Sequence, residues 1–463
     1  MQITSHLLNI FDSHQVRVDT DSLTRYGKDW SNAATPDPVA IVFPESTEQV
    51  QALVKLANQQ LFSLVPSGGR TGLSGGAIAA NREVVVSFEK MNHIVDFNPI
   101  DRSVLCQAGV ITQQLQQFAK EQHLYYPVDF ASSGSSHVGG NIATNAGGIK
   151  VVRYGLTRNW VTGLTVVTGS GDLLNLNHGL LKNATGYDFR QAFIGSEGTL
   201  GFITQATMQL TKMPNNLTVM VLGISDIASI MKTFQAFRNA VDPTALELFS
   251  AGSVRIVHAH KGVPKPFETD APYYLLVEFE NDAEATENRM LSTFEHCLNE
   301  GWVIDGVMSQ SEQQARNLWR LREDISESIS QFTPYKNDLA VKVSDIPPFL
   351  AALDALVDEH YPDFDVLWYG HIGDGNLHLN ILKPADMDTA VFFAICNEVN
   401  PHVFQLVKAF NGSISAEHGV GLLKRDYLSY SRSESEIAYM RALKAMFDPN
   451  GIMNPGKLFT TDR

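Results

Sequence analysis

The chain has 463 residues, which is too many for one compact core, so we expect two or three domains. It is 44% hydrophobic and 18% charged, which is ordinary for a soluble globular protein. Its net charge of −15 argues against nucleic acid and anionic membranes as partners, because both select for a basic surface.

Its three cysteines are far apart and form no CxxC pair, so the sequence supports neither a disulfide framework, nor a thiolate zinc site, nor an iron–sulfur cluster. The N-terminus has no basic region followed by an apolar run, which argues against a signal peptide. No apolar stretch approaches the ~18 residues of a transmembrane helix. We therefore expect a cytoplasmic location and no membrane span.

The first half of the chain is predicted to alternate short strands and helices. Residues 1–35 form a helical lead, and residues 36–213 form a first domain. Ser46 is a good N-cap for an amphipathic helix, which stands between strands at 39–44 and 62–66. Four more strands and one helix complete this domain: strands 84–88, 103–109, 164–169 and 201–210, and helix 111–123.

After about residue 216, glycine becomes rarer and the helices become longer. Helices beginning at Ile227 and Ala283 are expected to alternate with strands at 218–224, 273–280 and 340–344. This alternation predicts an α+β substrate domain with an antiparallel sheet over residues 214–386. Residues 387–463 are predicted to form a helical C-terminal segment that completes the active site.

Twenty of the 34 glycines fall between Gly68 and Gly201, and most of these lie in three loops, 66–76, 132–148 and 195–201. Consecutive glycines let backbone N–H groups approach an anion closely. The loops match neither a P-loop nor a Rossmann fingerprint. One such loop is more often a turn cluster than a cofactor cradle, but three in one domain indicate one long cofactor with a diphosphate.

The segment YGHIGDGNLHLN, residues 369–380, reads as a β-hairpin. Asp374 and Gly375 are favoured in a two-residue turn, and that turn would place His371 directly opposite His378. Cross-strand partners lie roughly 5 Å apart at Cβ, so the two imidazoles can share one metal ion. A pair of histidines in a polar patch is the plainer interpretation.

A second segment, SAEHGVG at 415–421, supplies a third expected ligand, Glu417, and next to it His418. A His₂Glu set leaves coordination positions open for substrate, as catalytic metal sites do. Nitrogen and oxygen ligands fit Zn²⁺, and manganese or cobalt less specifically. His418 is a candidate general base, because imidazole titrates near neutral pH. The alternative role for His418 is to orient another ligand.

The three glycine-rich motifs, in this order and spacing, resemble the FAD-binding domain of the vanillyl-alcohol oxidase flavoprotein superfamily over residues 36–213. The resemblance implies non-covalent FAD, because Arg70 stands where several covalent members carry histidine. It assigns the following residues to the cofactor: Pro66, Ser67, Gly68, Gly69, Arg70, Thr71, Gly72, Ser132, Ser133, Gly134, Gly139, Gly140, Asn141, Thr144, Asn145, Gly147, Gly148, Tyr154, Glu197, Gly198, Gly201, Ile203 and Asn454.

The second half, with GHIGDGNLHLNI, SISAEHGVGLLKRDYL and DPNGIMNPGKLF, resembles the FAD-dependent 2-hydroxyacid dehydrogenases, and the resemblance covers nearly the whole chain. These enzymes pass the C2 hydride of a hydroxyacid to flavin N5. The resemblance is greatest to the branch that oxidises D-2-hydroxyglutarate to 2-oxoglutarate. It implies an electron-transferring flavoprotein or a quinone as acceptor, and a homodimer.

A dicarboxylate substrate needs an anion site beyond the metal. Residues 318–330 read as one helix, which places Arg322 and Ser326 at i and i+4 on one face, and Lys336 follows in a predicted loop. The resemblance assigns these three residues to the distal carboxylate, with Ser326 where threonine is also expected. It adds Asn380 and His418 as further substrate contacts. For Arg322, an exposed charge paired with Glu323 or Asp324 is the plainer alternative.

Three other functions remain open at this stage. The same metal and flavin could serve a D-lactate or glycolate dehydrogenase, with the cations facing a smaller acid. The chain could be the flavin-binding subunit of a larger electron-transfer complex. A metal hydrolase without flavin fits the glycine-rich loops least well.

Overall fold

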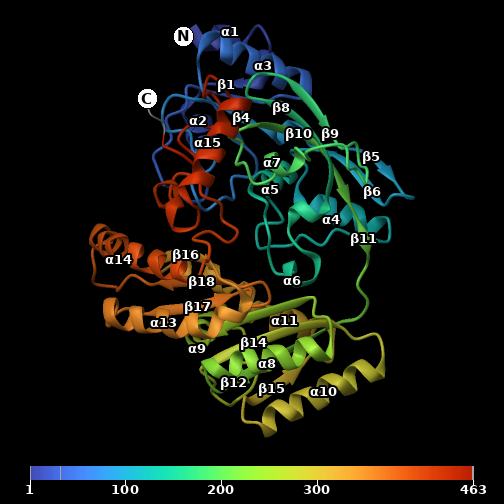
Figure 1. Cartoon of the computed structure of the whole chain (residues 1–463), viewed down its shortest axis with the longest axis vertical. Coiled ribbons are helices and arrows are strands. Elements are labelled where there is room, and N and C mark those ends of the chain that lie inside the picture. The colour runs from blue at the N-terminus through green and yellow to red at the C-terminus, as the bar shows by residue number, and fades with distance from the viewer. Residues whose placement is uncertain (1, 32, 461–463) are drawn as a thin grey trace. The chain divides into compact units, whose positions relative to one another are not determined.

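The computed structural model describes residues 2–31 and 33–460, and it divides into two compact units (Figure 1). We call them the glycine-rich unit, which runs to Gly147 and continues with Gly155–Met213 and the chain from Glu417 onward, and the sheet unit, Gly148–Tyr154 with Pro214–Ala416. The change at residue 213 coincides with a predicted boundary. The predicted segment 387–463 is instead divided at residue 416, and residues 148–154 leave the predicted first domain for the sheet unit.

The first sheet of the glycine-rich unit has four strands in the order β1-β2-β4-β3. Its strands are β1 (Val16–Arg17), β2 (Ala40–Val42), β3 (Leu64–Ser67) and β4 (Val84–Ser87). β4 pairs in parallel with both β2 and β3. Helix α3 (Thr47–Gln60) packs on this sheet through the predicted apolar face, and the amide of Gln49 donates to Oγ of the predicted N-cap, Ser46.

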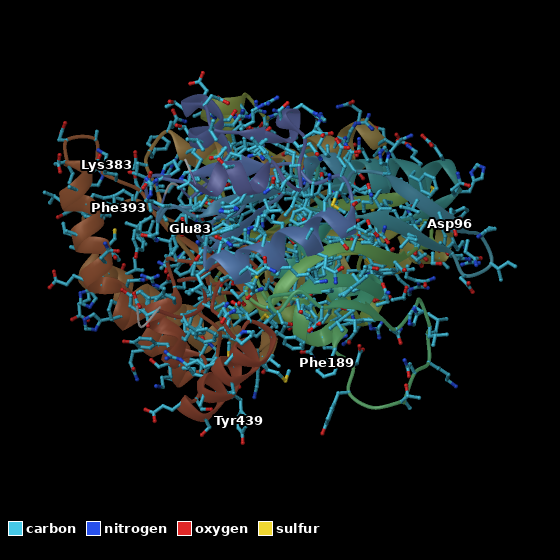
Figure 2. All side chains as sticks on the ribbon, turned by 90° about the horizontal axis from the view of Figure 1, so that it is seen from above. Glu83, Asp96, Phe189, Lys383, Phe393 and Tyr439 are labelled. Carbon is cyan, nitrogen blue, oxygen red and sulfur yellow. The ribbon has the colours of Figure 1, made fainter. Side chains whose placement is uncertain are left out.

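The second sheet of this unit is antiparallel, with five strands in the order β5-β6-β10-β8-β9. Its strands are β5 (Ile94–Asn98), β6 (Ser103–Gln107), β8 (Val161–Thr168), β9 (Leu173–Leu176) and β10 (Gly201–Gln209). Asp96, labelled in Figure 2, is an exposed charge on the edge strand β5, a position that discourages pairing with another chain. Helices α4 (Thr112–Glu121) and α5 (Val138–Thr144) share a buried apolar core with this sheet.

The remaining elements of the glycine-rich unit are short, apart from its last helix. They are α1 (Gln2–Leu7), α2 (Thr20–Tyr26), α7 (Arg190–Phe193), α15 (Glu434–Phe447) and the two-stranded pair β7 (Leu124–Tyr125) and β11 (Thr211–Lys212). The predicted strands and helices of residues 36–213 are confirmed in position, within a few residues at their ends.

The sheet unit is built on one antiparallel sheet of seven strands in the order β15-β12-β14-β13-β17-β18-β16 (Figure 1). Its strands are β12 (Leu217–Ile224), β13 (Ala245–Ser250), β14 (Tyr273–Glu280), β15 (Val303–Met308), β16 (Tyr335–Ala340), β17 (Val366–Gly370) and β18 (Asn376–Ile381). The predicted α+β class with an antiparallel sheet is therefore confirmed. The predicted histidine hairpin, β17 with β18, lies inside the sheet between β13 and β16 rather than at its centre.

Helices cover this sheet, and alternate side chains of β12, β13, β14 and β17 share a buried core with α9, α11 and α12. The helices of the unit are α6 (Val151–Tyr154), α8 (Ile227–Ala240), α9 (Ala251–Lys261), α10 (Glu284–Asn299), α11 (Glu312–Glu323), α12 (Ile325–Ser330), α13 (Ile346–His360) and α14 (Thr389–Ala409). Among residues 2–31 and 33–460, no helix combines the length and apolarity needed to cross a membrane.

One predicted strand of the sheet unit is wrong. Residues 340–344 were expected to be extended, but the strand β16 ends at Ala340, and Val343–Asp345 form a short 3-10 helix that leads into α13. The extended segment is the more polar stretch YKNDLA, which pairs along its whole length with β18. Burial beside a neighbouring strand outweighed the low strand propensity of lysine, asparagine and aspartate.

Candidate active site

The histidine hairpin has a different register from the one predicted. His378 lies opposite Tyr369, and the loop spans five residues, 371–375, instead of two. The loop is longer because the carbonyl of His371 accepts hydrogen bonds from the amides of Asp374 at 3.1 Å and Asn376 at 3.3 Å. The imidazole rings of His371 and His378 still lie close together, with centroids 5.5 Å apart.

A carboxylate that the sequence did not predict stands beside this pair. Asp338 lies on β16 directly opposite His378 on β18, is 1% exposed, and places Oδ1 3.8 Å from Nδ1 of His378. The amide of Ala416 donates to the carbonyl of Asp338 at 3.3 Å, and Oγ of Ser415 donates to Oδ2 at 3.4 Å. Glu417 follows Ala416 directly in the chain.

A second cluster joins three of the predicted substrate residues. Lys336 lies on β16 opposite Asn380, not in a loop, and its ammonium donates to Oγ of Ser326 at 3.1 Å. Burial lowers the pKa of Lys336. Asn380 is fully buried, and its Oδ1 forms no hydrogen bond within the described structure. An acceptor buried in this way is ready for a donor from a ligand.

Arg322 lies on the same helical segment as Ser326, but that segment is not continuous. Helix α11 ends at Glu323 and α12 begins at Ile325, with Asp324 between them. Arg322 is 7% exposed, and its Nε lies 2.8 Å from Oε2 of Glu247 on β13, close enough for an ion pair but not angled as a hydrogen bond. The alternative of an exposed charge is therefore wrong for Arg322.

The three glycine-rich loops converge within the glycine-rich unit. A Cβ on Gly69 of the first loop would stand 2.1 Å from the backbone carbonyl oxygen of Ser135 in the second, and one on Gly198 of the third would stand 2.5 Å from the ring carbon Cγ of Pro66. Asn454 links the first and third loops, because its Nδ2 donates to the carbonyls of Gly76 at 2.9 Å and Glu197 at 2.7 Å. Glycine is required where another backbone or a rigid proline ring approaches so closely.

Buried polar atoms in these loops fit a polar cofactor. Oγ of Ser67, Nδ1 of His137 and Oδ1 of Asn454 are buried and form no hydrogen bond among the residues that the structure describes. His137 was not predicted as a cofactor residue; burial, with a smaller contribution from the charge of Arg70, lowers its pKa to about 4, so it is neutral at pH 7. Neutral donors and acceptors of this kind suit a bound nucleotide.

The predicted cofactor residues lie at the end of β3, in α5, on β10 and in the loops beside these elements. Pro66 and Ser67 end β3, and the loop after it holds Gly68, Gly69, Arg70, Thr71 and Gly72; around α5 lie Ser132, Ser133, Gly134, Gly139, Gly140, Asn141, Thr144, Asn145 and Gly147; at and before β10 lie Glu197, Gly198, Gly201 and Ile203. Asn454 joins them near the C-terminus. Gly148 and Tyr154 belong to the sheet unit instead.

The segment that carries Glu417 and His418 is fixed on its C-terminal side by Glu197. The carboxylate of Glu197 accepts hydrogen bonds from the amides of Val420 at 2.7 Å and Gly421 at 2.8 Å, and burial raises its pKa. Oγ of Ser74 donates to the carbonyls of His418 and of the next residue, both at 2.9 Å. Nε2 of His418 lies 4.0 Å from Oε1 of Glu417.

Comparison with known proteins defines the class of this chain. Residues 38–177 match the family model described as "FAD binding domain", and residues 213–458 match "FAD linked oxidases, C-terminal domain". A solved structure of p-cresol methylhydroxylase with substrate bound superposes with a TM-score of 0.77 at 16% identity, over 99% of this chain and 96% of that one. The predicted vanillyl-alcohol oxidase-type fold is confirmed, and the protein is an FAD-linked oxidase by class.

Two curated relatives narrow this class. A D-2-hydroxyglutarate dehydrogenase of Stutzerimonas stutzeri is 62% identical over 99% of this chain and 98% of its own length. Another of Xanthomonas citri pv. viticola is 52% identical over 96% of this chain and 94% of its own. The chain therefore belongs to the D-2-hydroxyglutarate dehydrogenase family of FAD-dependent oxidoreductases that act on a hydroxyacid.

Proposed function

We propose that this chain oxidises D-2-hydroxyglutarate to 2-oxoglutarate with FAD and a divalent metal ion. The observation that carries the proposal is that the sheet unit places histidines and a carboxylate beside two cations, the half-buried Lys336 and the buried Arg322. A 2-hydroxy dicarboxylate presents a chelating end and a distal anion, so it needs both kinds of group. A monocarboxylate needs only the first.

The residues present fit a divalent metal. The candidate ligands are His371, His378 and Glu417, to which we now add Asp338 as a ligand or as the partner that orients His378. All offer nitrogen or oxygen, and the three cysteines are buried outside this set, which favours zinc in a site open to substrate. When bound, the metal supplies a Lewis acid for the substrate hydroxyl and C1 carboxylate, and FAD supplies the acceptor for the C2 hydride.

The distal carboxylate is held by this chain's own side chains. Lys336 offers one charge-assisted hydrogen bond, while Ser326 holds its ammonium in place. Arg322 keeps its terminal Nη groups available for a bidentate bond, since it is Nε that faces Glu247. Asn380, buried opposite Lys336, completes the predicted substrate contacts.

Proton transfer falls to His418. Its imidazole takes the proton of the substrate hydroxyl as C2 is oxidised, which is the role of a general base. The bonds from Val420 and Gly421 to Glu197, and from Ser74 to the carbonyl of His418, fix the backbone of the segment that carries this imidazole. His418 therefore combines the roles of catalytic base and substrate contact.

The test is the bleaching of the flavin absorbance under anaerobic conditions. D-2-hydroxyglutarate, its L-enantiomer, D-malate, D-lactate and glycolate are added in turn, before and after chelator treatment. Rapid bleaching by D-2-hydroxyglutarate alone, lost with chelator and restored by zinc, supports the proposal. If the flavin is still bleached after all metal has been removed, the proposed role of the metal is wrong.

A D-lactate or glycolate dehydrogenase is the second candidate, and one observation favours it. Arg322 is already paired with Glu247, so its charge is partly satisfied without a substrate carboxylate. Comparable bleaching by D-lactate and D-2-hydroxyglutarate supports this alternative. An electron-transferring flavoprotein or a quinone as acceptor, and a homodimer, complete the proposal on the strength of the family resemblance. The cytoplasmic location rests on the sequence features described above.

A further inference from the structure

A single buried carboxylate stands between the candidate metal ligand His371 and the candidate substrate residue Arg322. The side chain of Glu247 is 1% exposed. Its Oε1 lies 2.8 Å from Nδ1 of His371, and its Oε2 lies 2.8 Å from Nε of Arg322. One residue thus touches both halves of the proposed recognition machinery.

The backbone around Glu247 fixes this position. Its neighbour Leu248 pairs with Gly370, the last residue of β17, and the carbonyl of Leu246 accepts a hydrogen bond at 3.3 Å from the amide of Gly373 in the loop. The loop that carries His371 is therefore tied to β13 on both sides of Glu247. Because Glu247 stands on a central strand, its carboxylate is held in place beside His371 and Arg322.

We propose that Glu247 is a positioning residue that couples metal binding to recognition of the distal carboxylate. The inference rests on the proposed function and deepens it. A carboxylate only accepts hydrogen bonds, so Nδ1 of His371 must carry the proton, which leaves the lone pair of Nε2 for a metal ion. The same carboxylate holds the guanidinium by its Nε edge.

The orientation of Arg322 is fixed from a second direction. Its guanidinium carbon lies 4.6 Å from the ring centroid of Tyr369, the residue that pairs with His378 on the neighbouring strand. With one edge held by Glu247 and one face held by an aromatic ring, the two terminal Nη groups remain to bind an anion. The geometry thus pre-organises both the imidazole and the guanidinium through one charge.

The test compares wild-type enzyme with Glu247→Gln, which has nearly the same shape but no charge. Zinc affinity of the chelator-treated flavoprotein is measured by calorimetry, and we expect a loss of about 10- to 100-fold, as for other partners of metal-bound histidines. KM for D-2-hydroxyglutarate is then measured at saturating zinc, where we expect a further rise. Arg322→Met should raise this KM less in the Glu247→Gln background than in wild type, because the two residues act together.

Glu278→Gln is the matched control. Glu278 lies on the adjacent strand β14, on the same face and 3% exposed, but it bonds Lys150, Thr244 and Trp319 instead of the site. It should leave zinc affinity unchanged. If Glu247→Gln does not fold, as judged by flavin content, Glu247→Asp replaces it and should lose zinc affinity through its shorter reach.

The outcomes separate this inference from the proposed function. Wild-type enzyme that binds no zinc and is not reduced by D-2-hydroxyglutarate overturns the function itself. Wild-type enzyme that does both, with unchanged zinc affinity and unchanged KM in Glu247→Gln, overturns only the role of Glu247. An equal loss of zinc affinity in Glu278→Gln also overturns it, because any buried carboxylate would then have the same effect.

Discussion

The two units offer different kinds of groups to their expected ligands. The glycine-rich unit brings its loops close together, with Gly69 against the backbone of Ser135 and Gly198 against the ring of Pro66, and a few neutral polar atoms among its described residues form no hydrogen bond. The sheet unit brings charged side chains together on strands, with Lys336, Asp338 and Glu247 all buried or half-buried. We therefore expect the glycine-rich unit to bind its ligand mainly through exposed backbone, and the sheet unit to bind its ligand mainly through charged side chains.

Because of this difference, substitutions in the two units should affect different properties of the protein. A substitution in the glycine-rich unit adds volume, so it should affect cofactor retention and folding together. A substitution in the sheet unit removes a charge or a ligand from a rigid strand, so it should affect chemistry or substrate choice while flavin stays bound. Four substitutions test this contrast.

The largest effect is expected at His378. His378→Ala removes a proposed metal ligand, so we expect no bound zinc and a loss of at least about 1,000-fold in kcat/KM, since a Lewis acid contributes several kcal/mol. Flavin content should remain normal. Metal analysis and steady-state kinetics check this.

A matched control for His378 is available in the same unit. The rings of His360 and His402 also lie close together, with centroids 5.1 Å apart, but they stand on α13 and α14 instead of on the hairpin. His402→Ala should change neither metal content nor activity. A loss of zinc in this variant would mean that the hairpin is not the principal metal site.

The next effect concerns substrate choice. Lys336→Met removes one charge-assisted hydrogen bond, worth about 1.5–3 kcal/mol, so KM for D-2-hydroxyglutarate should rise by roughly 30-fold while D-lactate is little affected. Steady-state kinetics with both acids measure the difference. An equal loss for the two acids would contradict a role in binding the distal carboxylate.

Lys336 also predicts a pH dependence, because burial holds its pKa below the ordinary value of 10.5. Its charge, and with it the affinity for a dicarboxylate, should fall as pH rises through this lowered pKa. Stability without substrate should change in the opposite sense, rising over the same window, because there the unfolded chain binds the additional proton. Lys336→Met should abolish both trends in alkaline pH titrations of KM and of unfolding.

The contrast between the units also explains what the sequence could predict. Glycines in loops form a local pattern, so their spacing predicted three loops and one long cofactor with a diphosphate, and the family resemblance then identified that cofactor as FAD. The charged face of the sheet unit depends on strand pairing between distant segments. Lys336 was expected in a loop because YKND has weak strand propensity, and the hairpin register was missed by two residues because bonds to His371 lengthen the turn.

Glu247 and Asp338 were missed for the same reason, although one signal was present. In the strand ALELFS, Glu247 occurs at alternate positions with Ala245 and Phe249, so it faces the core. A lone charge on a buried strand face requires a partner. The sequence shows that such a partner must exist, but only the fold reveals that the partners are His371 and Arg322.

A smaller effect is expected in the glycine-rich unit. Gly69→Ala places a Cβ 2.1 Å from a backbone oxygen of Ser135, so the two loops must move apart. We expect FAD affinity to fall by about tenfold, equivalent to ~1.4 kcal/mol, together with lower stability of the apoprotein. Gly72→Ala meets only the side chain of Asp29, at 3.5 Å, and should leave apoprotein stability unchanged. Fluorescence titration with FAD and thermal unfolding separate the two variants.

The smallest effect tests how finely the sheet unit is arranged. Ser326 holds the ammonium of Lys336 through one hydrogen bond at 3.1 Å. Ser326→Ala should raise KM for D-2-hydroxyglutarate about threefold, because one such bond contributes roughly 0.5–1 kcal/mol. Ser326→Thr keeps the hydroxyl and should restore the wild-type KM. In the Lys336→Met background, Ser326→Ala should have almost no effect, since the hydroxyl then has no ammonium to orient. A threefold effect that persists there would make Ser326 a direct contact of the substrate instead of a support for Lys336.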